Sequence, residues 1–160
     1  MDKENYIFSF NCSKNILISS IDKLKVVNAD NSTNTNLLCR RINNKVKFML
    51  YTNNTPGSYS IYKGVLDTYF FEGEVFENES ISYISGSFKS SLASKVFDIL
   101  GFVFSLIFPM VAFFDDFVVI ELLFVPIIFI VSTIFLKKNT ENRLLNKIKE
   151  FEENINLNKY

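Results

Sequence analysis

Two long apolar runs in the C-terminal half constrain this chain more than any other feature of its sequence. They cover residues 96–114 (VFDILGFVFSLIFPMVAFF) and 117–136 (FVVIELLFVPIIFIVSTIFL), with only Asp115 and Asp116 between them. Because a helix rises about 1.5 Å per residue, either run can cross the roughly 30 Å hydrocarbon core of a bilayer. Neither run has a polar face. We therefore predict a transmembrane hairpin, with a re-entrant hairpin or a buried helix pair as the alternatives.

The charges around the two runs predict which way the hairpin faces. The short connection carries two aspartates and no basic residue. Because loops rich in Lys and Arg stay on the cytoplasmic side, we expect a two-pass protein of the cytoplasmic (inner) membrane with both termini in the cytoplasm. The basic residues on the two outer flanks are Lys89, Lys95, Lys137, Lys138, Arg143, Lys147 and Lys149.

Small and polar residues recur at helical spacing in both runs, which places them on one face of each expected helix. Small residues let two helix backbones approach closely, so the simplest interpretation is that these faces pack the hairpin together. The alternative is that they line a pore formed by several copies. The candidates for membrane or oligomer contacts are Asp98, Gly101, Ser105, Glu121 and Ser132.

Glu121 is the most unusual of these residues, because a carboxylate inside a bilayer is costly. The cost at the bilayer centre is about 2.5–3.5 kcal/mol and falls toward the edges. Glu121 follows Phe117 by four residues, so we expect it about 6 Å inside the outer boundary. Protonation, contact with the interface, or water in an assembly would each accommodate it. Intramembrane acids are candidates for function, and the alternative is that Glu121 is shallow enough to be harmless.

Residues 1–95 have an ordinary globular composition and predict a cytosolic α+β domain. Helical spacing of Leu17 and Ile21 after an N-cap at Ser13 predicts one helix. Gly73 and Gly86 fall inside strands, which indicates bulges or the close approach of another backbone. We expect an antiparallel sheet of about five strands, with a small barrel as the alternative. The strand candidates are residues 6–12, 37–42, 45–51, 60–63, 68–76 and 81–89, with Asn43-Asn44 as a tight turn.

Residues 137–160 predict a cytosolic amphipathic tail helix. Leu144, Ile148, Phe151 and Ile155 recur at helical spacing with charged residues between them. We expect this helix to dock back onto the sheet, and a short coiled coil with a second copy is the alternative. The predicted organisation is therefore a domain over residues 1–95, a hairpin over 96–136 and a tail over 137–160.

A cluster of basic residues lies on the expected hairpin of residues 37–51. Cross-strand proximity makes it a candidate site for an anionic ligand or for lipid head groups, and a solvated strand face is the alternative. Four glutamates on the next hairpin predict a charged edge that discourages strand pairing. The candidate ligand-binding residues are Arg40, Arg41, Lys45 and Lys47.

The composition argues against an enzyme. Histidine is absent, which removes the usual catalytic triads and the commonest zinc ligand. Cys12 and Cys39 form no CxxC pair, and we expect no metal and no cofactor. Lys plus Arg equals Asp plus Glu, at 17 each, so no excess of positive charge indicates a nucleic acid polymer as a partner.

Short motifs along the chain resemble a known kind of protein. Phe8-Ser9-Phe10 leads into Ser13-Lys14-Asn15, and Phe71-Glu72-Gly73-Glu74-Val75 and Ile84-Ser85-Gly86-Ser87-Phe88 precede a lysine-led apolar segment. This arrangement resembles small uncharacterised bacterial membrane proteins whose cytosolic α+β domain is tethered to a two-helix hairpin. A looser similarity links it to two-transmembrane effectors of bacterial antiphage systems, in which the hairpin precedes the β-domain.

These observations lead to two functional hypotheses. The first is a membrane-tethered, non-enzymatic binding or accessory module whose cytosolic domain recognises a protein or small ligand. The second is a ligand-triggered, oligomerising, membrane-disrupting effector of a bacterial defence system. Both make the lipid bilayer a partner, and the second also requires a homo-oligomer.

Overall fold

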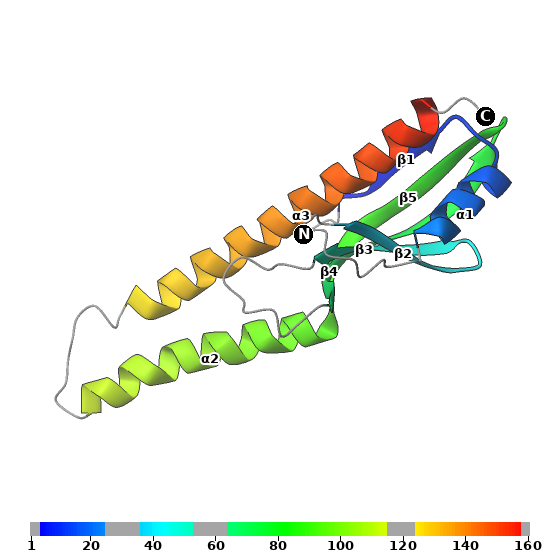
Figure 1. The fold of residues 1–160 in the computed structure, drawn as a ribbon. Helices are drawn as coiled ribbons and strands as arrows, with labels where there is room; N and C mark the ends of the chain where they lie inside the picture. The colour runs from blue at the N-terminus through cyan, green and yellow to red at the C-terminus, as the bar shows by residue number, and fades with distance from the viewer. Residues whose placement is uncertain (1–3, 25–35, 53–63, 115–123, 158–160) are drawn as a thin grey trace.

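The structure is a computed structural model that describes residues 4–24, 36–52, 64–114 and 124–157. These residues form an antiparallel sheet of five strands and three helices, so the predicted α+β class is confirmed. The strands are β1 (Tyr6–Phe10), β2 (Asn36–Ile42), β3 (Lys45–Thr52), β4 (Gly64–Asn78) and β5 (Ile81–Ser90), and the helices are α1 (Lys14–Lys23), α2 (Leu92–Phe114) and α3 (Val125–Leu157) (Figure 1).

The strands form an open sheet in the order β1-β5-β4-β3-β2, with β1 and β2 at its edges. Among the described residues these two edge strands do not pair with each other, so the alternative of a closed barrel is not formed. The strand candidate at residues 60–63 lies outside the described part of the chain.

Both tight turns of the sheet use residues in the left-handed region. Ile42 pairs with Lys45, so Asn43 and Asn44 form the predicted two-residue connection, with φ 54° at Asn43. The β4–β5 turn holds Glu79 at φ 49° and Ser80 at φ 71°. Side chains other than Asn and Gly are strained there, so the second turn is held by the pairing of its strands rather than by its own sequence.

A glycine pair lets β4 and β5 approach closely, as the sequence suggested. Gly73 lies directly opposite Gly86 in the strand register. A Cβ on Gly86 would come within 2.2 Å of the Glu72 carbonyl oxygen and 2.4 Å of the Gly73 Cα. No side chain fits there without moving β4.

One face of the sheet carries the core, and α1 and α3 cover it (Figure 1). Phe48 and Phe71 are fully buried at its centre. Ser13 lies at the N-cap position of α1 but makes no side-chain cap, and Glu77 of β4 instead accepts a hydrogen bond from the Lys14 backbone N–H at 3.2 Å. The buried helix residues are Leu17 and Ile21 from α1 with Leu144, Ile148 and Ile155 from α3.

Helix α3 is one continuous helix of 33 residues, about 50 Å long. It runs through the boundary at residues 136 and 137, so the part of the second apolar run from Val125 onward and the amphipathic tail belong to the same helix rather than to two. Its second half docks on the sheet through Leu144 and Ile148, which confirms docking over the coiled-coil alternative. A change in the tilt of the first half would therefore be felt at the sheet.

The same half of α3 also protects the outer edge of β1. The Ser9 backbone N–H donates to Glu152 Oε1 at 2.6 Å, and the Asn11 N–H donates to Asn156 Oδ1 at 2.7 Å. Asn156 Nδ2 returns a hydrogen bond of 3.0 Å to the Ser9 carbonyl. These side chains take the place of a further strand along this edge.

Helices α2 and α3 extend side by side away from the sheet (Figure 1). Helix α2 begins at Leu92, four residues before the expected start at residue 96. Within the part of the chain that the structure describes, no helix combines the length and the apolar character needed to span a membrane.

Candidate functional site

The alternation of side chains splits the predicted basic cluster between the two faces of the sheet. Arg40, Lys45 and Lys47 lie on the face that α1 and α3 leave uncovered, which we call the helix-free face. In the register Arg40 pairs with Lys47, Lys47 with Glu72, and Lys45 with Glu74. A row of basic residues on β2 and β3 therefore lies beside a row of acidic residues on β4.

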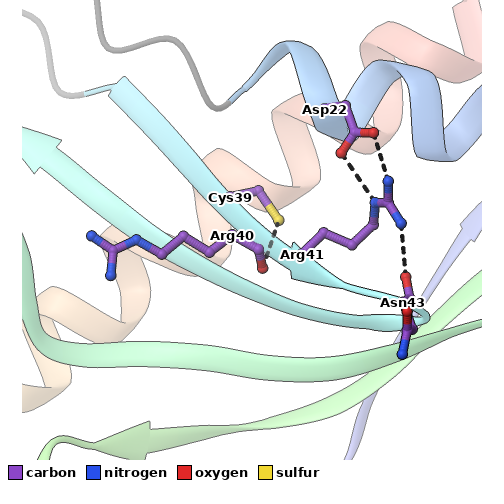
Figure 2. A network of polar contacts seen from close by, with 5 residues as sticks. All are labelled: Asp22, Cys39, Arg40, Arg41 and Asn43. Carbon is purple, nitrogen blue, oxygen red and sulfur yellow. Dashed lines mark hydrogen bonds and ion pairs between the residues drawn. The ribbon is translucent and has the colours of Figure 1, made fainter.

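Arg41 points to the opposite face and joins three elements of the domain (Figure 2). Its Nε and Nη2 atoms donate to both carboxylate oxygens of Asp22 on α1, at 3.0 and 2.6 Å, and its Nη1 donates to the Asn43 carbonyl at 2.9 Å. Hydrogen bonding to Asp22 raises the pKa of the Arg41 guanidinium. Arg41 thus fixes α1 against the β2–β3 hairpin, whereas the Arg40 side chain extends away from this network.

The helix-free face balances its charges locally. Glu72 forms an ion pair with Lys89 of β5. The hydrogen bond from Lys89 is the main cause that lowers the pKa of the Glu72 carboxyl, and the positive charges of Lys45 and Lys47 lower it further. The Lys47 Nζ lies 3.8 Å from the centre of the Phe70 ring, a cation–π contact. The face therefore presents mixed charges rather than the concentrated positive charge of an anion site.

Aromatic side chains extend the helix-free face toward the β4–β5 turn. The rings of Phe76 and Tyr83 stack with their centres 5.3 Å apart and their planes 15° from parallel. Phe76 remains 42% exposed. Tyr, Phe and Arg are enriched in surfaces that bind proteins, whereas Lys and Glu are depleted there, so the aromatic rings and Arg40 are the features of this face that such surfaces share.

Three of the predicted hairpin residues lie where α2 contacts α3. Asp98 forms an ion pair with Lys137 across the two helices. Gly101 receives the ring of Phe129, whose Cζ would lie 2.3 Å from a Cβ at this position. Ser105 is buried and donates to the carbonyl of Phe102 at 2.7 Å. These residues serve contacts within one hairpin.

The face of α3 that contacts α2 differs from the predicted one by one residue. Ser132 is exposed, whereas Thr133 is half-buried and donates to the Phe129 carbonyl at 2.9 Å. Glu121 lies outside the described residues. The contact pairs Gly101 of α2 with the aromatic ring of Phe129 of α3, a residue outside the predicted face.

Sequence reasoning missed a groove at the base of the hairpin. It has a volume of about 310 Å³ and lies between α2, α3 and β4. The charged residues that line it are Asp98 and Lys137. Asp98 and Lys137 are 39 positions apart, so no local pattern in the sequence indicates that they pair.

Two tyrosines next to the groove share one carboxylate. Tyr69 donates to Glu141 Oε2 at 3.1 Å, and Tyr6 approaches Glu141 Oε1 at 3.5 Å and donates to Glu4 at 2.7 Å. The pKa of Tyr6 is raised to about 12, mainly by its hydrogen bond to Glu4 and next by burial. The pKa of Tyr69 is also raised to about 12, mainly by burial and next by the charge of Glu141. Both phenols therefore stay protonated and tie β1 and β4 to α3.

The described residues contain no group of three or more His, Cys, Asp or Glu side chains suited to a metal ion. The thiols of Cys12 and Cys39 are buried in the core and are not joined in a disulfide. Burial raises the pKa of Cys12, which makes it a poor nucleophile at neutral pH.

The fold and its surfaces define a class of protein: an α+β domain whose last helix also forms half of an apolar helical hairpin. Comparison with protein-family models, with curated proteins and with solved structures finds no significant match to this chain.

Proposed function

We propose that this protein is a membrane-tethered, non-enzymatic binding module. In this proposal α2 and the first half of α3 insert into the cytoplasmic membrane, and the sheet domain lies on the cytoplasmic side with both termini. The observation that carries the proposal is the exposure of large apolar side chains around both helices. Phe97 is 74% exposed, Phe104 67% and Phe135 69%.

The free energy at stake makes water an unsuitable surrounding for this hairpin. Removing one large apolar side chain from water is worth about 1.5–3 kcal/mol. Six such side chains are each about two-thirds exposed, so their transfer to lipid gains about 6–12 kcal/mol in total; they are Phe97, Phe104, Phe135, Ile99, Ile128 and Ile134. That gain is comparable to the whole stability of an ordinary domain, about 5–15 kcal/mol.

Basic side chains at the base of the hairpin support the proposed orientation. Lys95 and Lys138 are exposed where α2 and α3 meet the sheet domain, and Lys137 lies beside them. Such residues favour the cytoplasmic side and its anionic lipids. The sheet domain would then stand directly on the cytoplasmic surface of the membrane.

The contacts within the hairpin favour a tether over a pore. A pore would need polar and small residues on a face that lines water. Asp98 and Gly101 are instead used between α2 and α3 of one chain, and the buried Ser105 hydroxyl is bonded within α2. The partner is then recognised by the sheet domain, on the helix-free face with Arg40, Phe76 and Tyr83, because α1 and α3 cover the other face.

Membrane fractionation with carbonate washing tests the tether. We expect the wild type to stay in the washed membrane pellet. Phe104→Lys combined with Ile134→Lys should release the chain, since each charge costs about 2.5–3.5 kcal/mol deep in the bilayer. Phe76→Lys is the matched control, because it places the same charge on an exposed ring of the sheet domain, and it should stay in the pellet. A wild type found in the supernatant would contradict the proposal.

Photocrosslinking in cells tests the binding face. A crosslinking side chain placed at Arg40 or Phe76 should give a discrete protein adduct. The same group at Glu153, which is exposed on α3, should give none. Equal adducts at all three positions would argue against a specific binding face.

A further inference from the structure

The groove at the base of the hairpin has no role in a simple tether, yet its lining combines apolar and polar side chains. Phe129 of α3 lies at the end toward the hairpin, and Phe97 of α2 lies next to Asp98. The end toward the sheet carries hydroxyl groups, with Ser94, Thr140 and Tyr69. A ligand that fits both ends is an amphiphile lying along the hairpin axis.

The charges of the groove restrict the polar end of that ligand. Asp98 and Lys137 line the groove and form an ion pair across it, so their charges sum to zero. Both side chains keep about a third of their surface exposed, at 30% for Asp98 and 36% for Lys137. An ion pair accessible from the groove complements a head group that itself carries one positive and one negative charge.

Three of the hydroxyl groups restrict the ligand further, because their protons are already used. Thr133 and Thr140 donate to carbonyls of their own helix at 2.9 Å, and Tyr69 donates to Glu141 at 3.1 Å. Each oxygen retains lone pairs, so these groups offer acceptors to the groove rather than donors. Together with the Asp98 carboxylate they suit an ammonium group that carries N–H protons.

We infer that this groove binds the head group of one phosphatidylethanolamine molecule. The phosphate lies at Lys137, the primary ammonium lies among Asp98 and the hydroxyl oxygens, and the glycerol end runs along Phe97 and Phe129. Phosphatidylglycerol lacks the cation, and phosphatidylcholine lacks the N–H donors. The inference rests on the proposed function, because the groove reaches lipid head groups only if the hairpin is in the membrane.

Lipid retention by the full chain tests this inference. The protein is reconstituted in vesicles of equal parts phosphatidylethanolamine, phosphatidylcholine and phosphatidylglycerol, extracted in mild detergent and measured by native mass spectrometry. The wild type should retain one phosphatidylethanolamine with at least about tenfold preference. Asp98→Asn, which removes the anion, and Ser94→Phe, which fills the groove, should each reduce this retention at least about tenfold.

Glu150→Gln is the matched control. It makes the same carboxylate-to-amide change in another ion pair of α3, with Lys147, and should retain lipid as the wild type does. If Asp98→Asn fails to fold, as judged by reactive thiols at Cys12 and Cys39, Ser94→Phe decides, because it leaves the ion pair in place.

Two results would overturn the inference: equal retention of the three lipids by the wild type, or unchanged retention in the folded groove variants. If the chain resists carbonate washing but retains no phosphatidylethanolamine, lipid binding in the groove is refuted and the proposed function stands. A chain that leaves the membrane refutes the proposed function instead.

Discussion

The docking of α3 on the sheet can be tested through Ile148. This side chain is 0% exposed and lies in the core formed with the sheet and α1. Ile148→Ala removes three carbon atoms, a transfer loss of about 2.4 kcal/mol at about 0.8 kcal/mol each. The cavity left behind adds about 1 kcal/mol, because a packed core collapses only in part. We expect a loss of about 3–4 kcal/mol in the free energy of unfolding.

The two buried thiols provide the assay. Cys12 and Cys39 are inaccessible in the folded chain, so a thiol-reactive fluorophore reports unfolding of the sheet domain as the full protein is heated in detergent. For a chain of this length about 1 kcal/mol shifts the melting temperature by about 2–4 °C, so Ile148→Ala should melt about 6–16 °C below the wild type.

Leu157→Ala is the control, since Leu157 lies on the same helix and is 79% exposed. It should change the free energy of unfolding by less than about 0.5 kcal/mol. If the two variants melt within about 2 °C of each other, α3 does not complete the core and the reasoning fails.

Three further predictions concern the sheet. Gly86→Ala should lower the melting temperature, because the new Cβ overlaps the Glu72 carbonyl at a cost of about 1–3 kcal/mol or more. This cost exceeds the gain of about 0.4–1 kcal/mol that comes from a stiffer unfolded chain. An unchanged melting curve would contradict this. Ser80→Gly should raise the free energy of unfolding in a urea titration by about 0.5–1 kcal/mol by relieving φ 71°, and a loss of stability would argue against strain. The pKa of Tyr69 in the folded chain, about 12, lies above the ordinary value of 10.0. The protonated Tyr69 therefore contributes its full stabilisation below pH 10.0, and this stabilisation is lost as the pH rises from 10.0 to about 12. Glu141→Gln should therefore lower the midpoint of tyrosinate absorbance, and an unmoved midpoint would exclude this carboxylate as a cause.

The sequence predicted the features that depend on local pattern. Alternation located the strands of the described sheet, and Asn43 marked a turn because few residues accept positive φ. Helical spacing of Leu144, Ile148 and Ile155 identified the face of α3 that docks. The continuity of α3 was missed because its hydropathy changes abruptly at Lys137, and a change of surroundings does not end a helix.

The predicted sites were less accurate, for physical reasons visible in particular residues. Arg40 and Arg41 were grouped by proximity, although neighbours in a strand point to opposite faces. Helical spacing from Glu121 places Ser132 on the predicted contact face, whereas the structure places Phe129 against Gly101. One residue along a helix turns the contact face by about 100°, which moves Thr133 toward α2 and leaves Ser132 exposed.

The position of α3 in the chain has a consequence for biogenesis. A ribosome releases β1 to β5 first, then both apolar segments, and only afterwards the residues around Ile148 and Ile155 that close the core. The nascent sheet must therefore wait with its aromatic face open until the last helix emerges. A chain truncated or stalled after the hairpin would lack the helix residues that cover Phe48 and Phe71, and cells pass such incompletely folded chains to chaperones and proteases. Completion of the domain thus reports that synthesis has passed the hairpin.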